Sequence, residues 1–279
     1  MIAVHKQPAV LASAKITPLE QLAELSAPFV PDFANNIPES VLPSVLGRVV
    51  AEYAIEIDSR LTDWYTVLER LHMLPRYVPR LPPNIIKIMY SDCCIFKNSN
   101  GRPYKVIDSH SLKLVPGQSK SLIRTVECIQ KRARKYGLAD PDLYRIHTFW
   151  LKAFEKYGNK DRIVPIEWHL MTKWAIPNTD KVPRDQHAAM IAAVNRKTSL
   201  RYQTLSLQTS PFVLFFHSMA TGERLLAGRP SFSYVKERAE DTPLVIGKYS
   251  EKGLMIHRGP KETDYRNVGI GSVVVLLFI

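Results

Sequence analysis

The spacing of apolar residues changes along this chain, and that change constrains the fold more than any other feature. Up to about residue 201, apolar residues recur three and four positions apart, which is typical of helices with one buried face. After residue 201, short apolar runs alternate with glycine and proline, which is typical of antiparallel strands. The sequence therefore predicts an α+β fold, mainly helical in its N-terminal and middle parts and followed by a C-terminal antiparallel sheet.

Individual elements follow from the same spacing and from turn signals. We predict a hairpin turn at residues 98–101, with a strand or buried segment over 85–96 and a returning strand over 104–107. Helices are predicted over residues 17–25, 43–73 (with a break near 59–62), 119–136, 140–157, 165–174 and 185–200. Strands are predicted over residues 211–219, 224–226, 232–235, 244–249, 254–257 and 272–279.

A proline-rich segment at residues 75–83 marks the first boundary along the chain. Prolines at this density favour an extended connector over a helix or a central strand. We therefore predict a helical region over residues 1–80, a basic and mainly helical nucleic-acid-binding region over 84–201, and an antiparallel β region over 202–279.

The positive charge is concentrated in the second of these regions. The formal net charge is +12 for 279 residues. Residues 81–201 carry twenty-two Lys and Arg against ten Asp and Glu, whereas the segments before and after them are close to neutral. A concentrated positive field suits a phosphate backbone, because binding then releases condensed counterions. The charge therefore predicts a polyanionic partner.

The helix predicted over residues 119–136 has an apolar stripe and a basic face, so it can pack on a core and still present cations. The predicted hairpin turn adds cations and asparagine amides, which can read base edges. We expect the helix to form one wall of a basic groove and the turn to read sequence; a solvated helix and a flexible hairpin are the competing interpretations. The residues predicted to bind nucleic acid are Lys97, Asn98, Asn100, Arg102, Lys105, Lys120, Arg124, Lys131, Arg132, Arg134, Lys135, Arg196, Lys197 and Arg201.

The sequence carries no recognisable motif for a metal, a cofactor or a nucleophile, so we predict no cofactor, no metal site and no enzymatic activity. Three cysteines, two of them adjacent, lack the spacing of a zinc site. There is no GxSxG, P-loop or GxGxxG pattern. We interpret His147, His169 and His217 as core or boundary residues. His257 beside Arg258 keeps one alternative open, because a histidine with neighbouring cations is the minimum set for metal-free RNA cleavage.

The expected location is the cytoplasm, without membrane association. No basic leader followed by an apolar core is present, and the longest apolar run, residues 273–279, is far too short to span a membrane. The few cysteines fit a reduced compartment.

Two segments of the C-terminal region carry a resemblance to a known family. They are the apolar run SPFVLFF at residues 210–216 and TGERLL at residues 221–226, which follow the basic helical region. In these segments, and in size and charge layout, the chain is similar to the large-subunit-like protein of type IV CRISPR-Cas complexes. The resemblance implies a non-enzymatic subunit at one end of a crRNA-guided complex, which contacts the motif flanking the target in duplex DNA and helps to open the duplex. Some relatives carry a cysteine-rich zinc-finger-like element, which this chain lacks.

Three functions are therefore consistent with the sequence. The leading hypothesis is a nucleic-acid-binding subunit of a ribonucleoprotein complex, which binds duplex DNA or guide RNA and other subunits. The second is a metal-free guide-RNA-processing ribonuclease that uses His257. The third is a structural scaffold protein whose basic face binds an acidic protein partner.

Overall fold

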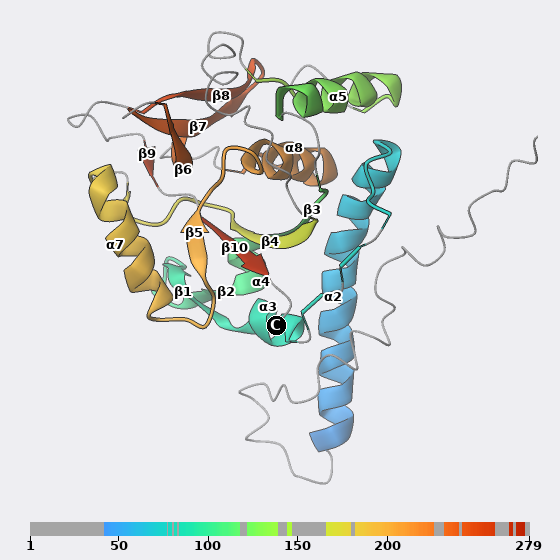
Figure 1. Ribbon diagram of the computed structural model, residues 1–279. Helices are drawn as coiled ribbons and strands as arrows, with labels where there is room; N and C mark the ends of the chain where they lie inside the picture. Colours follow the sequence, from blue (N-terminus) through green and yellow to red (C-terminus); the bar gives the residue numbers. More distant parts are fainter. Residues whose placement is uncertain are drawn as a thin grey trace, which may run out of the picture.

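The computed structural model describes residues 42–76, 78–79, 81–82, 84–117, 122–138, 144–146, 166–179, 182–225, 232–239, 242–259, 268–269 and 272–276 (Figure 1). Within these ranges helices are combined with mainly antiparallel sheets, which confirms the predicted α+β class. No helix among the described residues is long and apolar enough to cross a membrane.

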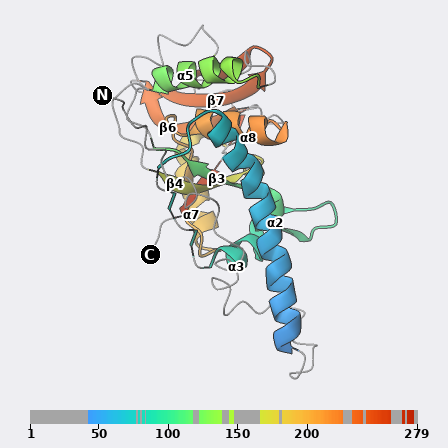
Figure 2. The ribbon, with the colours of Figure 1, turned by 90° about the vertical axis from the view of Figure 1, so that its right-hand side faces the viewer.

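Helix α2 (Leu42–Arg70) stands along one side of the molecule, and its N-terminal end projects beyond the other elements (Figure 2). The predicted break near residues 59–62 is wrong. The helix continues through this point, where Arg60 Nη2 donates a 2.6 Å hydrogen bond to Glu56 Oε1 one turn earlier. Its fully buried residues recur at helical spacing and form the face that packs on the core: Ala54, Ile57, Leu61, Trp64 and Leu68.

A helix and a hairpin follow the proline-rich segment. Helix α3 (Ile85–Tyr90) replaces the first half of the predicted strand, and β1 (Asp92–Lys97) is its second half. Strand β2 (Pro103–Lys105) returns antiparallel to β1, so the predicted hairpin is confirmed. The chain then turns into the short helix α4 (Val106–Ser109) at the place where the sequence predicted the end of the strand.

A four-stranded antiparallel sheet lies at the centre of the molecule. Its strand order is β3 (His110–Val115), β4 (Glu167–Thr172), β10 (Ser272–Leu276) and β5 (Tyr202–Thr204). The sequence did not predict β3, and the helix predicted over residues 165–174 is wrong because this segment is strand β4. The last predicted strand is confirmed as β10, which pairs with β4 on one side and β5 on the other.

A second sheet contains the other C-terminal strands. Strands β6 (Phe232–Ala239), β7 (Thr242–Ser250) and β8 (Gly253–Arg258) confirm three predicted strands and pair antiparallel in chain order, whereas the last predicted strand belongs to the central sheet. The short strand β9 (Val268–Gly269) joins β6 in parallel.

Helix α8 (Ser210–Thr221) lies between the two sheets (Figures 1 and 2). The sequence predicted a strand over residues 211–219, and this prediction is wrong. Every residue of the helix from Ser210 to Ser218 is buried, so no polar face reveals a helical period. Gly222 ends the helix in the left-handed conformation, and the described part of the strand predicted over 224–226 is not a strand.

Helix α5 (Leu122–Lys135) and helix α7 (Arg184–Asn195) confirm two predicted helices, although α7 ends five residues early. Gly137 follows α5 with a φ of 64°, the left-handed conformation that is typical of a glycine at the end of a helix. The helix predicted over 17–25 lies outside the described residues, as does most of the one predicted over 140–157. In the described part of the latter, Ile146 instead forms an isolated bridge with Leu254.

The main core cluster extends across all three predicted sequence regions. It includes Leu61 of α2, Leu170 of β4 and Phe215 of α8. The central sheet likewise joins β3 and β4 from the second region to β5 and β10 from the third. The long helix, both sheets and the buried helix therefore share one apolar interior.

Candidate nucleic-acid interface and a buried polar pocket

Helix α5 presents most of its predicted cations to solvent. Arg124, Lys131, Arg134 and Lys135 are exposed, whereas Ile129 on the opposite face is fully buried. Their positions follow from the amphipathic sequence, because the apolar stripe fixes which side faces outward. Lys120 precedes the helix and lies outside the described residues.

Arg132 is the exception on this helix, because it has a structural role. Its Nη1 donates 2.6 Å hydrogen bonds to the carbonyl oxygens of Leu71 and His72, at the end of α2. Arg70 Nη2 returns a 3.1 Å bond to the carbonyl oxygen of Tyr136. Arg132 and Arg70 therefore join the C-terminal ends of α2 and α5.

The hairpin between β1 and β2 carries a second predicted group. Lys97, Asn100 and Arg102 are exposed. Asn98 instead shapes the turn, because its Oδ1 accepts hydrogen bonds from the backbone N–H groups of Asn100 and Arg102, both at 3.0 Å. Lys105 forms a 2.8 Å ion pair with Asp92. The turn thus presents exposed cations, but the side-chain oxygen of Asn98 already accepts two backbone hydrogen bonds within the turn.

The third predicted group follows α7, and it lies near the hairpin. Arg196, Lys197 and Arg201 are exposed. Burial, then the neighbouring Cys93, raises the pKa of the Cys94 thiol in β1, and the charge of Lys197 acts against that rise. Lys197 is therefore close enough to the hairpin to influence its electrostatics.

The predicted cations thus form two separate groups. Helix α5 lies at one end of the molecule, whereas the β1–β2 hairpin lies well away from it in both views (Figures 1 and 2). The structure does not bring α5 and the turn together as the two sides of one groove. The alternative site at His257 falls in β8, where its backbone pairs with Val245.

A pocket of about 290 Å³ lies between α2, β3 and α8, and the sequence did not predict it. Ser111 and Lys113 line it from β3, two residues apart on one face of the strand. His217 lines it from α8, with Lys173 after β4 and Glu223 after α8. Five polar side chains from three parts of the sequence therefore meet at one cavity.

Lys113 is the most unusual residue of this pocket. It is only 3% exposed, and its Nζ lies 4.4 Å from the centroid of the Trp64 ring. Trp64 is fixed in turn, because its Nε1 donates a 3.1 Å hydrogen bond to the carbonyl oxygen of Leu114. Burial, followed by the charge of Lys173, lowers the pKa of Lys113 to about 7. Burial therefore favours the neutral amine far more than it does for an exposed lysine.

His217 connects the two sides of the pocket. Its Nδ1 lies 3.2 Å from Ser111 Oγ and its Nε2 lies 3.1 Å from Glu223 Oε2. Burial, then the charges of Lys113 and Lys173, lowers the pKa of His217 to about 3, so the ring is neutral. We assign its proton to Nε2, because an ionised carboxylate only accepts hydrogen bonds; the Ser111 hydroxyl then donates to Nδ1.

The order serine, histidine, carboxylate has the arrangement of a nucleophile, a base and an orienting group. The basicity of the histidine decides what this row can do. An imidazole with a pKa of about 3 takes a proton from serine roughly a thousand times less readily than one at the ordinary value. We therefore interpret this row of hydrogen bonds as a wall of the pocket that fixes the position of Ser111.

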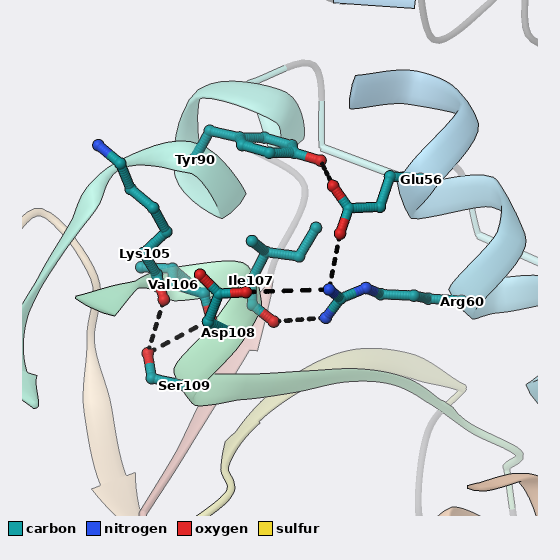
Figure 3. Close-up of polar contacts among 8 residues, drawn as sticks. All are labelled: Glu56, Arg60, Tyr90, Lys105, Val106, Ile107, Asp108 and Ser109. Carbon is teal, nitrogen blue, oxygen red and sulfur yellow. Dashed lines mark hydrogen bonds and ion pairs between the residues drawn. The ribbon is translucent and has the colours of Figure 1, made fainter. Parts of the chain in front are cut away.

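Arg60 also borders the pocket, but contacts between helices occupy its guanidinium (Figure 3). Nη1 donates a 2.6 Å hydrogen bond to the carbonyl oxygen of Ile107, and Nη2 pairs with Glu56 at 2.6 Å. Asp108 lies 3.9 Å away. The Tyr90 hydroxyl donates to the other oxygen of Glu56, and burial followed by this bond raises the pKa of Tyr90, so the phenol stays protonated.

One sequence signal could have indicated this pocket. Lys113 interrupts the apolar run formed by Leu112, Leu114 and Val115, and a lysine inside a buried strand requires a reason. No spacing rule connects Lys113 with His217 or Glu223, because the fold brings them together over about a hundred residues.

No family model matches this chain, and no similar curated protein or solved structure was found. The functional argument therefore depends on the charges and geometry described above.

Proposed function

We propose that this protein binds nucleic acid through the exposed basic face of α5. One observation carries the proposal: Arg124, Lys131, Arg134 and Lys135 all project from a helix whose other face is anchored in the core. Cations held on a rigid helix can follow a phosphate backbone with little further ordering. The exposed Glu127 is the acidic residue among them.

The hairpin and the residues after α7 supply a second contact. Lys97 and Arg102 at the turn, with Arg196, Lys197 and Arg201 nearby, form a positive surface away from α5. A nucleic acid that contacts both surfaces has to extend along the molecule, whereas a short one occupies either. Lengthening the probe should therefore increase the affinity once both surfaces are reached.

Charge reversal on α5 tests this function. We expect the triple variant K131E, R134E, K135E to weaken binding of duplex DNA and of RNA at least tenfold. We also expect the dependence of log K on log salt to become shallower by about 0.9 for each phosphate that the variant no longer neutralises. Fluorescence anisotropy over a salt series measures both quantities. Arg132 is left unchanged because it supports α2.

A matched control has the same change in net charge at scattered sites. Arg48, Lys87 and Lys252 are exposed and lie outside both basic groups. The triple variant R48E, K87E, K252E should therefore retain most of the affinity for duplex DNA and RNA. Equal loss in the two triple variants would show that only the overall field matters. Full affinity in the α5 variant would contradict the proposal and favour a scaffold that binds an acidic protein.

The specific form of the proposal is a non-enzymatic subunit of a crRNA-guided complex that contacts the motif flanking the target in duplex DNA. It is supported by the size and charge layout; the segment SPFVLFF, predicted to be a strand, forms α8 instead. Purification from cells with sequencing of the bound nucleic acid tests it. Retained guide RNA together with other subunits is the expected result, and protein free of RNA would contradict it.

A further inference from the structure

Lys113 is a buried lysine whose ammonium form has no carboxylate partner within ion-pair distance among the described residues. No ion pair within 4.0 Å joins its ammonium to any acidic group among the described residues, and its one close polar contact there is the Trp64 ring. Removing an ammonium from water without a counter-ion costs several kcal/mol. A protein that needed only packing at this position would place an apolar residue on the strand.

The surroundings of Lys113 leave room for a counter-ion from outside. Lys113 lines the 290 Å³ pocket, which is large enough for a small ligand but lies at the lower limit of ligand-binding sites. Burial also lowers the pKa of Lys173, the second ammonium on the same pocket. Two cations whose charged forms are both disfavoured gain from the same anion, and together they match a dianion.

The other polar groups at the pocket do not satisfy these cations. Arg60 is occupied by Glu56 and Ile107, and Asp63 and Glu223 are exposed carboxylates that act on Lys113 from a distance. His217 is neutral, and its Nδ1 accepts the hydrogen bond that the Ser111 hydroxyl donates.

We infer that this pocket binds a small tetrahedral oxyanion of the phosphate class, with Lys113 as its buried counter-ion and Lys173 as the second cation. This pocket is separate from the basic surface of α5, so the test of anion binding does not depend on the test of nucleic-acid binding. It makes Lys113 a ligand-binding residue that the strand accommodates at a cost in stability.

Titration of the full chain with inorganic phosphate tests the inference. Isothermal titration calorimetry at pH 8 in two buffers of different ionisation enthalpy should show binding coupled to proton uptake, because the anion restores the charge of Lys113. Sulfate keeps its charge throughout, so its affinity should fall up to tenfold per pH unit above 7. The pKa of Lys113 also depends on four nearby charged groups: Lys173 and Arg60 lower it, whereas Asp63 and Glu223 raise it. Absence of phosphate binding to the wild-type chain would overturn the inference, and this measurement needs no variant.

The variant K113M separates binding from stability. Methionine keeps a long apolar stem against Trp64, so we expect K113M to fold with an equal or higher Tm and to lose phosphate binding at least tenfold. For the wild type, phosphate at about a hundred times Kd should raise Tm by roughly 5 °C. K252M, at an exposed lysine, is the matched control. Binding to K113M as tight as to the wild type would place the ion elsewhere and overturn the assignment.

A comparison of two phosphate sources identifies the form of the ligand. Glycerol phosphate and inorganic phosphate carry the same charged group, but the ester occupies more of the cavity. Tighter binding of the ester identifies a phosphorylated small molecule, whereas tighter binding of the inorganic ion identifies free phosphate.

Discussion

His110 and His217 are 1% and 3% exposed, and each is held neutral by the fold. Burial lowers the pKa of His110 to about 4, and burial with the nearby lysines lowers that of His217 to about 3. In the unfolded chain both rings take up a proton near pH 6.5. Their contribution to stability is therefore complete above pH 6.5 and is lost as the pH falls toward 4 and then 3.

We predict that acid destabilises the protein steeply in this window. Each histidine should lower the free energy of unfolding by up to about 1.4 kcal/mol per pH unit below 6.5. Thermal unfolding between pH 7 and 4 measures the slope, and H110Q should reduce it while partly keeping the contact with the Tyr202 hydroxyl. H72N, at an exposed histidine with positive φ, should leave the slope unchanged. Equal slopes in wild type and H110Q would contradict the assignment of neutral His110.

At the scale of elements, three glycines show two reasons why a larger residue would be strained: a left-handed backbone and a steric clash. Gly137 after α5 and Gly101 in the hairpin have positive φ, but an added Cβ would meet nothing within 4 Å at either position. Gly253 at the start of β8 also has positive φ, and its Cβ would lie 2.4 Å from the carbonyl oxygen of Arg145. A side chain at Gly137 or Gly101 would therefore strain only the backbone conformation. A side chain at Gly253 would also clash with the segment at Arg145.

Alanine substitutions should therefore fall into two classes. We expect G137A and G101A each to reduce the free energy of unfolding by about 1 kcal/mol, the cost of a left-handed alanine. We expect G253A to cost at least twice as much, because the backbone at Arg145 must move as well. Urea unfolding measures all three, and similar losses at Gly253 and Gly137 would show that the Arg145 segment yields easily.

Exposure to solvent decides which elements could be predicted from the sequence. Helices α2 and α5 have one solvent-facing side, so their apolar residues show a helical period. Strand β3 is buried at every position, and helix α8 is buried from Ser210 to Ser218, so neither shows a period that separates helix from strand. The exposed cations of α5 were predictable for the same reason, whereas the pocket around Lys113 depends on packing between distant segments.

For the whole molecule, the order of elements in the chain differs from their order in space. Strand β10 is the last described element, yet it occupies an interior position of the central sheet between β4 and β5. Strand β4 connects it to β3, which carries Ser111 and Lys113. The pocket therefore depends on a sheet in which residues 272–276 provide the strand between β4 and β5.

Truncation tests this dependence. A chain that ends at residue 271 lacks β10, so β4 and β5 lose the backbone partners that residues 272–276 provide. Unpaired strand edges inside a core are costly, and we expect this chain to lose its cooperative thermal transition and its near-UV circular dichroism. A chain that ends at residue 276 keeps every described pair and is the matched control. If the shorter chain unfolds cooperatively at the Tm of the control, β10 is dispensable; if both chains lose the transition, residues 277–279 are needed as well.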